Sequence, residues 1–195
     1  MEDYLRVNDK RVSIVNQPER RYASIRYEIS TEMMSDYILA IDDDVFLSPE
    51  QLRDMFSCLV LDPMKVHGFA GQVYSEDLKS CSMFLSRNMP VEALVMMFAY
   101  TKTHLKKYFE IMNQLGIENK NLKSSEDVPL SFSGNCYARI HDIGYVARCP
   151  SADKEGVATW TAEGFDENRR FLVREMRELC LFDSGILKNN DVATA

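Results

Sequence analysis

The sequence predicts an α/β fold in which helices flank a mixed, Rossmann-like β-sheet. Apolar runs of strand length alternate with longer segments whose apolar residues recur at helical spacing, as is typical of this class. One of these runs ends directly in three aspartates, Asp42 to Asp44, where α/β sheets carry ligand sites. The 195 residues suit a single domain, which we expect over 1–187, followed by a polar tail over 188–195.

The composition argues against several classes of protein. The longest apolar run, Ala93 to Tyr100, has 8 residues, so we expect no transmembrane segment. A net charge of −7 argues against nucleic-acid binding. The 5 cysteines are widely spaced, which favours free thiols over a disulfide framework or a zinc site. These features favour a cytoplasmic location for the chain as it stands.

The first part of the chain predicts two strands separated by a helix. Val12–Val15 has the pattern of a short buried strand, and apolar residues recur at helical spacing over Glu19–Met34. Tyr37–Ile41 is entirely apolar and has the length of a central strand. We expect this last run to be covered on both faces of the sheet.

A second helix is expected directly after the aspartate run. Ser48 and Gln51 form the pattern of a capping box, with proline at the first helical position between them. This helix should stop near Asp62. Two short strands around a polar turn over 75–80 should follow between Val66 and Leu85.

The second half of the chain continues the alternation of strands and helices. Hydrophobic periodicity and stop signals predict, in order, a strand over Glu92–Tyr100, a helix that ends at Gly116, a helix from Ser124 to about Ile140, a strand over Tyr145–Cys149 and a helix over Asp166–Phe182. The apolar stripe of the last helix is predicted to be Phe171, Met176, Leu179 and Cys180.

The aspartate run is the strongest functional signal. Three adjacent carboxylates repel one another, and packing does not require them at the end of an apolar strand. On an extended backbone, Asp42 and Asp44 point the same way, so Mg²⁺ or Mn²⁺ bound with a diphosphate would relieve the repulsion. The alternative interpretation is a solvated acidic turn that leads to the helix cap at Ser48.

A second acidic pair, Glu126-Asp127, opens the helix predicted after Ser124. In the structural interpretation, Ser124 and Asp127 form a capping box and the acids complement the helix dipole. In the functional interpretation, Asp127 faces a sugar or an acceptor hydroxyl held at the metal site. The residues alone do not choose between the two.

Three segments in this order resemble the exostosin and exostosin-like group of glycosyltransferases, which have the nucleotide-diphospho-sugar (GT-A) fold. The first is the strand with its aspartates and capped helix, followed by Val66-His67-Gly68-Phe69. The second runs from Ser125 to Phe132 and contains the acidic pair. The third, Lys154 to Trp160, is similar to the loop before the terminal helix of that group. The likeness spans Tyr37 to Leu187.

The resemblance implies a role for each candidate residue. Metal binding falls to Asp44 with Asp42, and Asp42 also lies near the ribose. Asp43 supports the site or makes a second contact with the nucleotide. Asp127, next to Glu126, is the carboxylate near the anomeric carbon or the acceptor. Arg169 or Arg170 is a candidate for the diphosphate, unless both are solvent-facing charges on a helix.

The function implied is transfer of a sugar from a UDP-sugar to a glycan-like hydroxyl acceptor, with retention and with Mn²⁺ or Mg²⁺. An inverting transferase, in which Asp127 is the general base, stays open. A non-catalytic module of the same fold is the main alternative from another class, and a phosphotransfer domain is a third. If a membrane anchor precedes the chain, the resemblance implies the lumen of the ER or Golgi.

Two departures from the group bear on activity. None of the chain's histidines (His67, His104 and His141) falls near Trp160, where the group has a further metal ligand, so the metal site is expected to be weaker or completed by water. Only 41 residues precede Asp42, so we expect the chain to lack the first βα unit of the fold. We expect an N-terminally shortened transferase with poor nucleotide affinity, unless a partner or the missing segment completes it.

Overall fold

The computed structural model describes residues 9–16, 22–122, 124–149 and 159–180. Its helices are α1 (Ile25–Glu32), α2 (Pro49–Leu61), α3 (Lys102–Gln114), α4 (Asp127–Ser131) and α5 (Phe165–Cys180). Its strands are β1 (Tyr37–Ile41), β2 (Val45–Phe46), β3 (His67–Gly68), β4 (Ala70–Tyr74), β5 (Cys81–Leu85), β6 (Met89–Val91), β7 (Ala93–Leu94), β8 (Met97–Thr101), β9 (Ala138–Ile140) and β10 (Ala147–Arg148).

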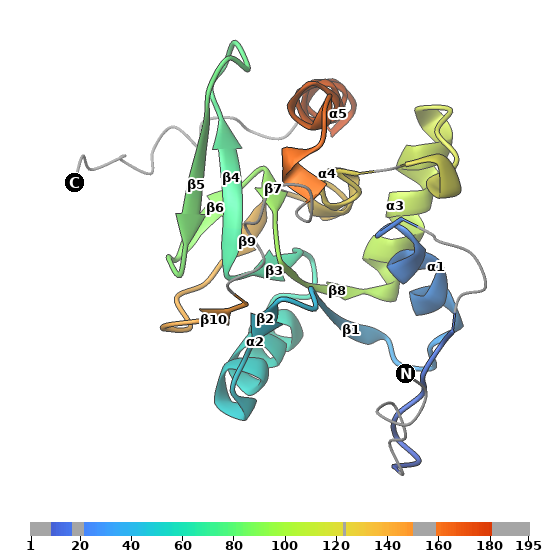
Figure 1. Cartoon of the computed structure of the whole chain (residues 1–195), viewed down its shortest axis with the longest axis vertical. Helices are drawn as coiled ribbons and strands as arrows, with labels where there is room; N and C mark the ends of the chain where they lie inside the picture. Colours follow the sequence, from blue (N-terminus) through green and yellow to red (C-terminus); the bar gives the residue numbers. More distant parts are fainter. Residues whose placement is uncertain (1–8, 17–21, 123, 150–158, 181–195) are drawn as a thin grey trace.

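The strands form a mixed sheet with two smaller sheets beside it (Figure 1). The main sheet has the order β1-β8-β3-β9-β6, in which only β3 and β9 run parallel. A second sheet has the order β5-β4-β7, and β2 pairs with β10. The predicted α/β class, with helices flanking a mixed sheet, is therefore confirmed.

Strand β8 shows how the sheet divides the core into two layers. Met97 and Ala99 pack with Met55 and Leu59 of α2 on one face. Phe98 and Tyr100 pack on the other face with the larger core formed by α1, α3, α4 and α5. Because successive side chains of a strand point to opposite faces, one buried strand serves both layers.

Strand β1 and helix α2 begin and end close to where the sequence predicts. Ser48 accepts a hydrogen bond from the backbone N–H of Gln51, and the Gln51 side chain accepts one from the backbone N–H of Ser48. Strand β1, however, is an edge strand among the described residues and not a central one. Tyr37 and Ile41 are each 37% exposed, so the prediction that this run is covered on both faces is wrong.

The N-terminal strand is not formed. Val12–Val15 has no strand partner among the described residues, and Val12 and Val15 are exposed. Within the predicted helix Glu19–Met34, α1 covers only Ile25–Glu32, and residues 17–21 lie outside the described part. In the described part of this region, the prediction from apolar residues therefore gave more strand and helix than the structure contains.

The strand predicted over Glu92–Tyr100 is broken into pieces. Met96 has a φ of 69°, in the left-handed region, which separates β7 from β8. Glu92 is buried between β6 and β7, where it accepts from the backbone N–H of Tyr74 and pairs with Arg177 of α5. The chain thus changes from one sheet to the other in the middle of an apolar run.

The helix predicted from Ser124 to about Ile140 is the largest error. Only α4 is helical, and Ala138–Ile140 forms β9. The Ser131 hydroxyl donates to the carbonyl of Asp127 and accepts the backbone N–H of Leu94, which ties the end of α4 to β7. A serine hydroxyl that bonds the carbonyl four residues earlier often bends a helix and slightly destabilises it.

The last helix has its predicted position but a different buried face. Arg169, Leu172, Val173 and Met176 are buried, at the spacing of one helical face. Of the predicted stripe, Phe171 and Leu179 are exposed. The tail after Cys180 lies outside the described residues.

Strand β10 forms inside the predicted Tyr145–Cys149 run, and the turn over 75–80 joins β4 to β5 as expected. No disulfide joins the cysteines of the described residues. Among the described residues, no helix is both long and apolar enough to span a membrane.

Candidate functional site

The aspartate run lies in a turn between β1 and β2. The backbone N–H of Asp42 donates to the carbonyl of Met96, between β7 and β8, at 2.8 Å, and the N–H of Val45 donates to the carbonyl of Asp42 at 3.3 Å. The extended backbone predicted for Asp42 to Asp44 is therefore wrong, because the run turns back to start β2. Asp43 is exposed, whereas Asp42 and Asp44 are half-buried.

Asp42 is held by a cation from α1. Its Oδ1 accepts from Nη1 of Arg26 at 2.7 Å. Burial raises the pKa of Asp42, Arg26 opposes this shift, and the charges of Asp127 and Asp44 add to it. The charge of Asp127, which is far from Asp42 in the sequence, therefore acts on Asp42 in the fold.

Asp44 is less completely satisfied. Its Oδ2 lies 4.0 Å from Nη2 of Arg148 on β10, and its carbonyl accepts the backbone N–H of Cys149 at 2.7 Å. The other carboxylate oxygen, Oδ1, is enclosed and has no hydrogen-bond partner. A buried polar atom without a partner is uncommon in a folded protein and calls for a missing donor or ion.

The acidic pair at the start of α4 does not cap that helix. Glu126 occupies the N-cap position without a side-chain capping bond, and Ser125 before it has a φ of 66°. Both carboxylate oxygens of Asp127 accept from the guanidinium of Arg169, at 2.6 and 2.7 Å. The capping-box interpretation of Ser124 and Asp127 is therefore wrong.

Arg169 reaches Asp127 from α5 and is itself 3% exposed. Its Nε donates to Oε1 of Gln72 on β4 at 2.5 Å, and the Tyr74 hydroxyl donates to the same oxygen. Arg169 is thus not a solvent-facing charge. The Arg170 side chain is 42% exposed, and its Nη2 lies 4.0 Å from Oδ2 of Asp166 on the same helix.

Glu126 is the most perturbed carboxyl of the site. Burial and the neighbouring Asp127 raise its pKa to about 7, while Arg26 lowers it. The hydroxyl of Tyr27, next to Arg26 on α1, is fully buried without a partner, and the charge of Glu126 raises the Tyr27 pKa further. A carboxyl with a pKa near neutrality can both donate and accept a proton.

Arg26 connects the two acidic segments. It bonds Asp42, and the charges of both Asp42 and Glu126 raise its pKa. The fold thus brings together Asp42, Glu126 and Asp127, with Asp44 next to them, while Asp43 and Arg170 stay outside. Sequence reasoning missed Arg26, Gln72 and Tyr27, because no motif marks a helix or strand residue that meets a carboxylate from elsewhere in the chain.

The histidines are engaged within the fold, away from these carboxylates. His67 Nδ1 and His141 Nε2 share a hydrogen bond of 2.8 Å, and His67 Nε2 bonds the carbonyl of Asp62 at 2.8 Å. Nδ1 of His104 accepts the backbone N–H of Thr101. In the described part of the chain, no group of three His, Cys, Asp or Glu side chains is arranged to hold a metal ion.

Only part of the third segment that carries the resemblance, Lys154–Trp160, is among the described residues. Residues 150–158, which contain most of Lys154–Trp160, lie outside the described residues. Trp160 sits in a short 3₁₀ turn, Thr159–Thr161, and is 53% exposed.

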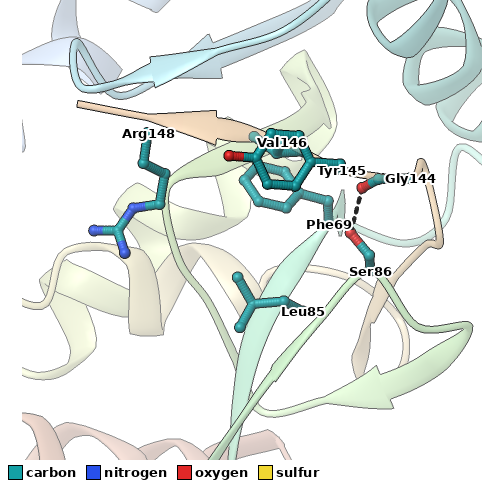
Figure 2. A pocket seen from close by; sticks show the side chains of 7 residues that line it. All are labelled: Phe69, Leu85, Ser86, Gly144, Tyr145, Val146 and Arg148. Carbon is teal, nitrogen blue, oxygen red and sulfur yellow. Dashed lines mark hydrogen bonds between the residues drawn. The ribbon is translucent and has the colours of Figure 1, made fainter. Parts of the chain in front are cut away.

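A surface pocket of about 350 Å³ lies beside strand β10, where Arg148 is part of its lining (Figure 2). It forms where β5 ends and where the loop after β9 leads into β10. The lining side chains that Figure 2 labels are largely apolar.

Comparison with known proteins does not add to this picture. No family model matches the chain, and no curated protein matches it.

Proposed function

We propose that this chain is a metal-dependent glycosyltransferase domain of the GT-A fold. It transfers a sugar from a nucleotide-diphospho-sugar, a UDP-sugar by resemblance, to a glycan or another hydroxyl acceptor. The proposal is supported by Arg26, which bonds Asp42 and lowers the pKa of Glu126, and by the charge of Asp127, which raises the pKa of both Asp42 and Glu126. Two acidic segments that are more than 80 residues apart in the chain thus influence each other's carboxyl groups in the fold.

Asp44, with Asp42, fits a site for Mn²⁺ or Mg²⁺. The buried Oδ1 of Asp44 lacks a partner, and these ions need only one or two carboxylates when phosphate oxygens complete the shell. Such an ion, when bound, neutralises the diphosphate leaving group.

The chain's own residues divide the remaining roles. Arg169 directs both of its terminal nitrogens to Asp127, so it is a positioning residue and not the diphosphate ligand predicted. In the transfer, the acceptor oxygen bonds the anomeric carbon, the bond from that carbon to the diphosphate breaks, and the hydroxyl proton goes to a base. Glu126, with a pKa of about 7, is better suited to take that proton than Asp127 if the transfer inverts.

The test is Mn²⁺-dependent binding of UDP, followed by release of UDP from a UDP-sugar. We expect Asp44→Asn to weaken Mn²⁺-dependent UDP binding at least tenfold and to abolish turnover. Asp54→Asn makes the same change at an exposed carboxylate of α2 and is the matched control. Equal UDP affinity and turnover in wild type and Asp44→Asn would reject the proposal.

One observation favours the non-catalytic alternative. Asp42 and Asp127 each have an arginine partner within the fold, so these carboxylates can be explained as links from α1 and α5 to the rest of the domain. In that case UDP binding would not respond to Mn²⁺ in any variant. The same titration therefore separates a transferase from a module of the same fold.

A further inference from the structure

The pocket beside Asp44 is built from segments that meet only in the fold. Leu85 and Ser86 come from the end of β5, and Tyr145 and Val146 come from the loop before β10. Ser86, with a φ of 45°, turns the chain there, and its hydroxyl donates to the carbonyl of Gly144 at 2.8 Å. In Figure 2 this hydrogen bond lies at one side of the pocket and Arg148 at the other.

The pocket wall is attached directly to the aspartate run. Strand β10 pairs with β2, and Cys149 after it donates its backbone N–H to Asp44. The side-chain amide of Gln51, at the start of α2, donates to the carbonyls of Ile143 and Tyr145 at 2.9 and 2.8 Å. A molecule in the pocket would therefore lie next to the proposed metal site, held by a wall that α2 fixes in place.

The lining of the pocket is poorly suited to a sugar ring. Phe69, Leu85, Val146 and the ring of Tyr145 are apolar, and the Ser86 hydroxyl is already engaged with Gly144. The charged side chain of the lining is Arg148, whose Nη2 lies 4.0 Å from Oδ2 of Asp44. Apart from Arg148 and the Tyr145 hydroxyl, the side chains of the lining offer the hydroxyls of a sugar ring few partners, which is unfavourable. Flat or compact apolar groups have no such cost, and about 350 Å³ is at the lower end of pockets that bind small molecules.

We propose that this pocket binds an aromatic or similarly compact apolar group carried by the acceptor. Its role in transfer rests on the proposed glycosyltransferase function, whereas the binding of an apolar group does not. The preferred acceptor is then a hydroxyl compound with an apolar part, and its hydroxyl lies on the Asp44 side of the pocket.

The probe is 2-naphthol, which carries a hydroxyl on a two-ring apolar group. Its binding is followed by its own fluorescence, with methyl β-D-glucoside as the polar competitor. We expect a Kd on the order of 1 mM, from the usual free energy of binding per atom of a small ligand, and no displacement by the glucoside. Displacement by the glucoside at comparable concentration would overturn the proposal.

Variants at Tyr145 locate the site without threatening the fold, because this side chain is 88% exposed. Tyr145→Ala should weaken binding of 2-naphthol roughly tenfold, and Tyr145→Phe should retain it. The control is Phe171→Ala, which removes another exposed ring, on α5. Equal affinity in wild type and Tyr145→Ala would place the probe elsewhere and overturn the proposal.

Release of UDP separates this proposal from the proposed function. Saturating 2-naphthol should raise UDP release above hydrolysis in wild type but not in Tyr145→Ala. Binding with unchanged UDP release would overturn the acceptor role of the pocket and leave the transferase intact. If 2-naphthol binds at Tyr145 and no protein releases UDP, the proposed function fails while the apolar site stands.

Discussion

The two acidic segments look alike in sequence but are treated differently by the fold. Asp127 is buried, and a bidentate arginine satisfies both of its oxygens. The aspartate run is half-buried, its arginine contacts are partly exposed, and one oxygen of Asp44 has no partner. The first arrangement links α4 to α5, and the second leaves one carboxylate oxygen of Asp44 without a hydrogen-bond partner.

The difference teaches that charge density alone does not identify a binding site. A carboxylate already neutralised within the fold has little affinity left for a cation, whereas a poorly paired one keeps it. This is why the metal site is proposed at the aspartate run and a positioning role is proposed for Arg169.

The largest effect is expected from breaking the buried pair. Arg169→Met should lower the free energy of unfolding by about 3–5 kcal/mol, because it leaves Asp127 buried without a cation. The melting temperature should fall by on the order of 10 °C. Denaturant unfolding and a thermal scan measure the two quantities.

The neighbouring Arg170→Met is the control, because Arg170 lies on the outer part of α5 with its side chain 42% exposed. It should change the stability by less than about 0.5 kcal/mol. Comparable losses in both variants would mean that the Asp127 pair is no more important than a surface charge, and the contrast between the two segments would disappear.

The sequence predicts the part of this contrast that depends on local pattern. The apolar strand, the aspartates and the capping box of Ser48 are adjacent in the chain, and each was found where expected. The role of Asp127 depends on Arg169, 42 residues away, and no local rule links the two. The short α4 was missed for a similar reason, because Ser131 bonds a distant strand.

A second prediction concerns the pH dependence that Glu126 gives the fold. Its pKa rises from 4.5 to about 7 on folding, so between these pH values the folded protein holds a proton that the unfolded chain has released. Stability therefore falls as the pH rises through this window. At 1.36 kcal/mol per pKa unit, the loss amounts to about 3 kcal/mol.

Glu126→Gln removes this titration. The variant should match wild type near pH 4.5 and exceed its free energy of unfolding by up to about 3 kcal/mol above pH 7. Glu110→Gln, at an exposed carboxylate of α3, should not change the slope. Parallel pH profiles for Glu126→Gln and wild type would contradict the raised pKa.

The smallest effect is expected at the pair that joins α1 to the aspartate run. The side chains of Arg26 and Asp42 are 26% and 32% exposed, so water screens their attraction. A double-mutant cycle of Arg26→Met and Asp42→Asn should give a coupling energy of about 1 kcal/mol or less, and this energy should decrease with added salt. A coupling energy of 3 kcal/mol or more, unchanged by salt, would mean that the Arg26–Asp42 pair behaves like the buried Arg169–Asp127 pair. The contrast between the two acidic segments would then be wrong.

The same Arg26→Met variant has a consequence for Glu126. Arg26 lowers the pKa of Glu126, so its removal should raise that pKa above 7. The fall in stability with pH should then extend to higher pH than in wild type. The small direct energy of the Arg26 pair and its effect on the buried Glu126 are thus separate quantities, because one depends on exposed charges and the other on a charge that water does not reach.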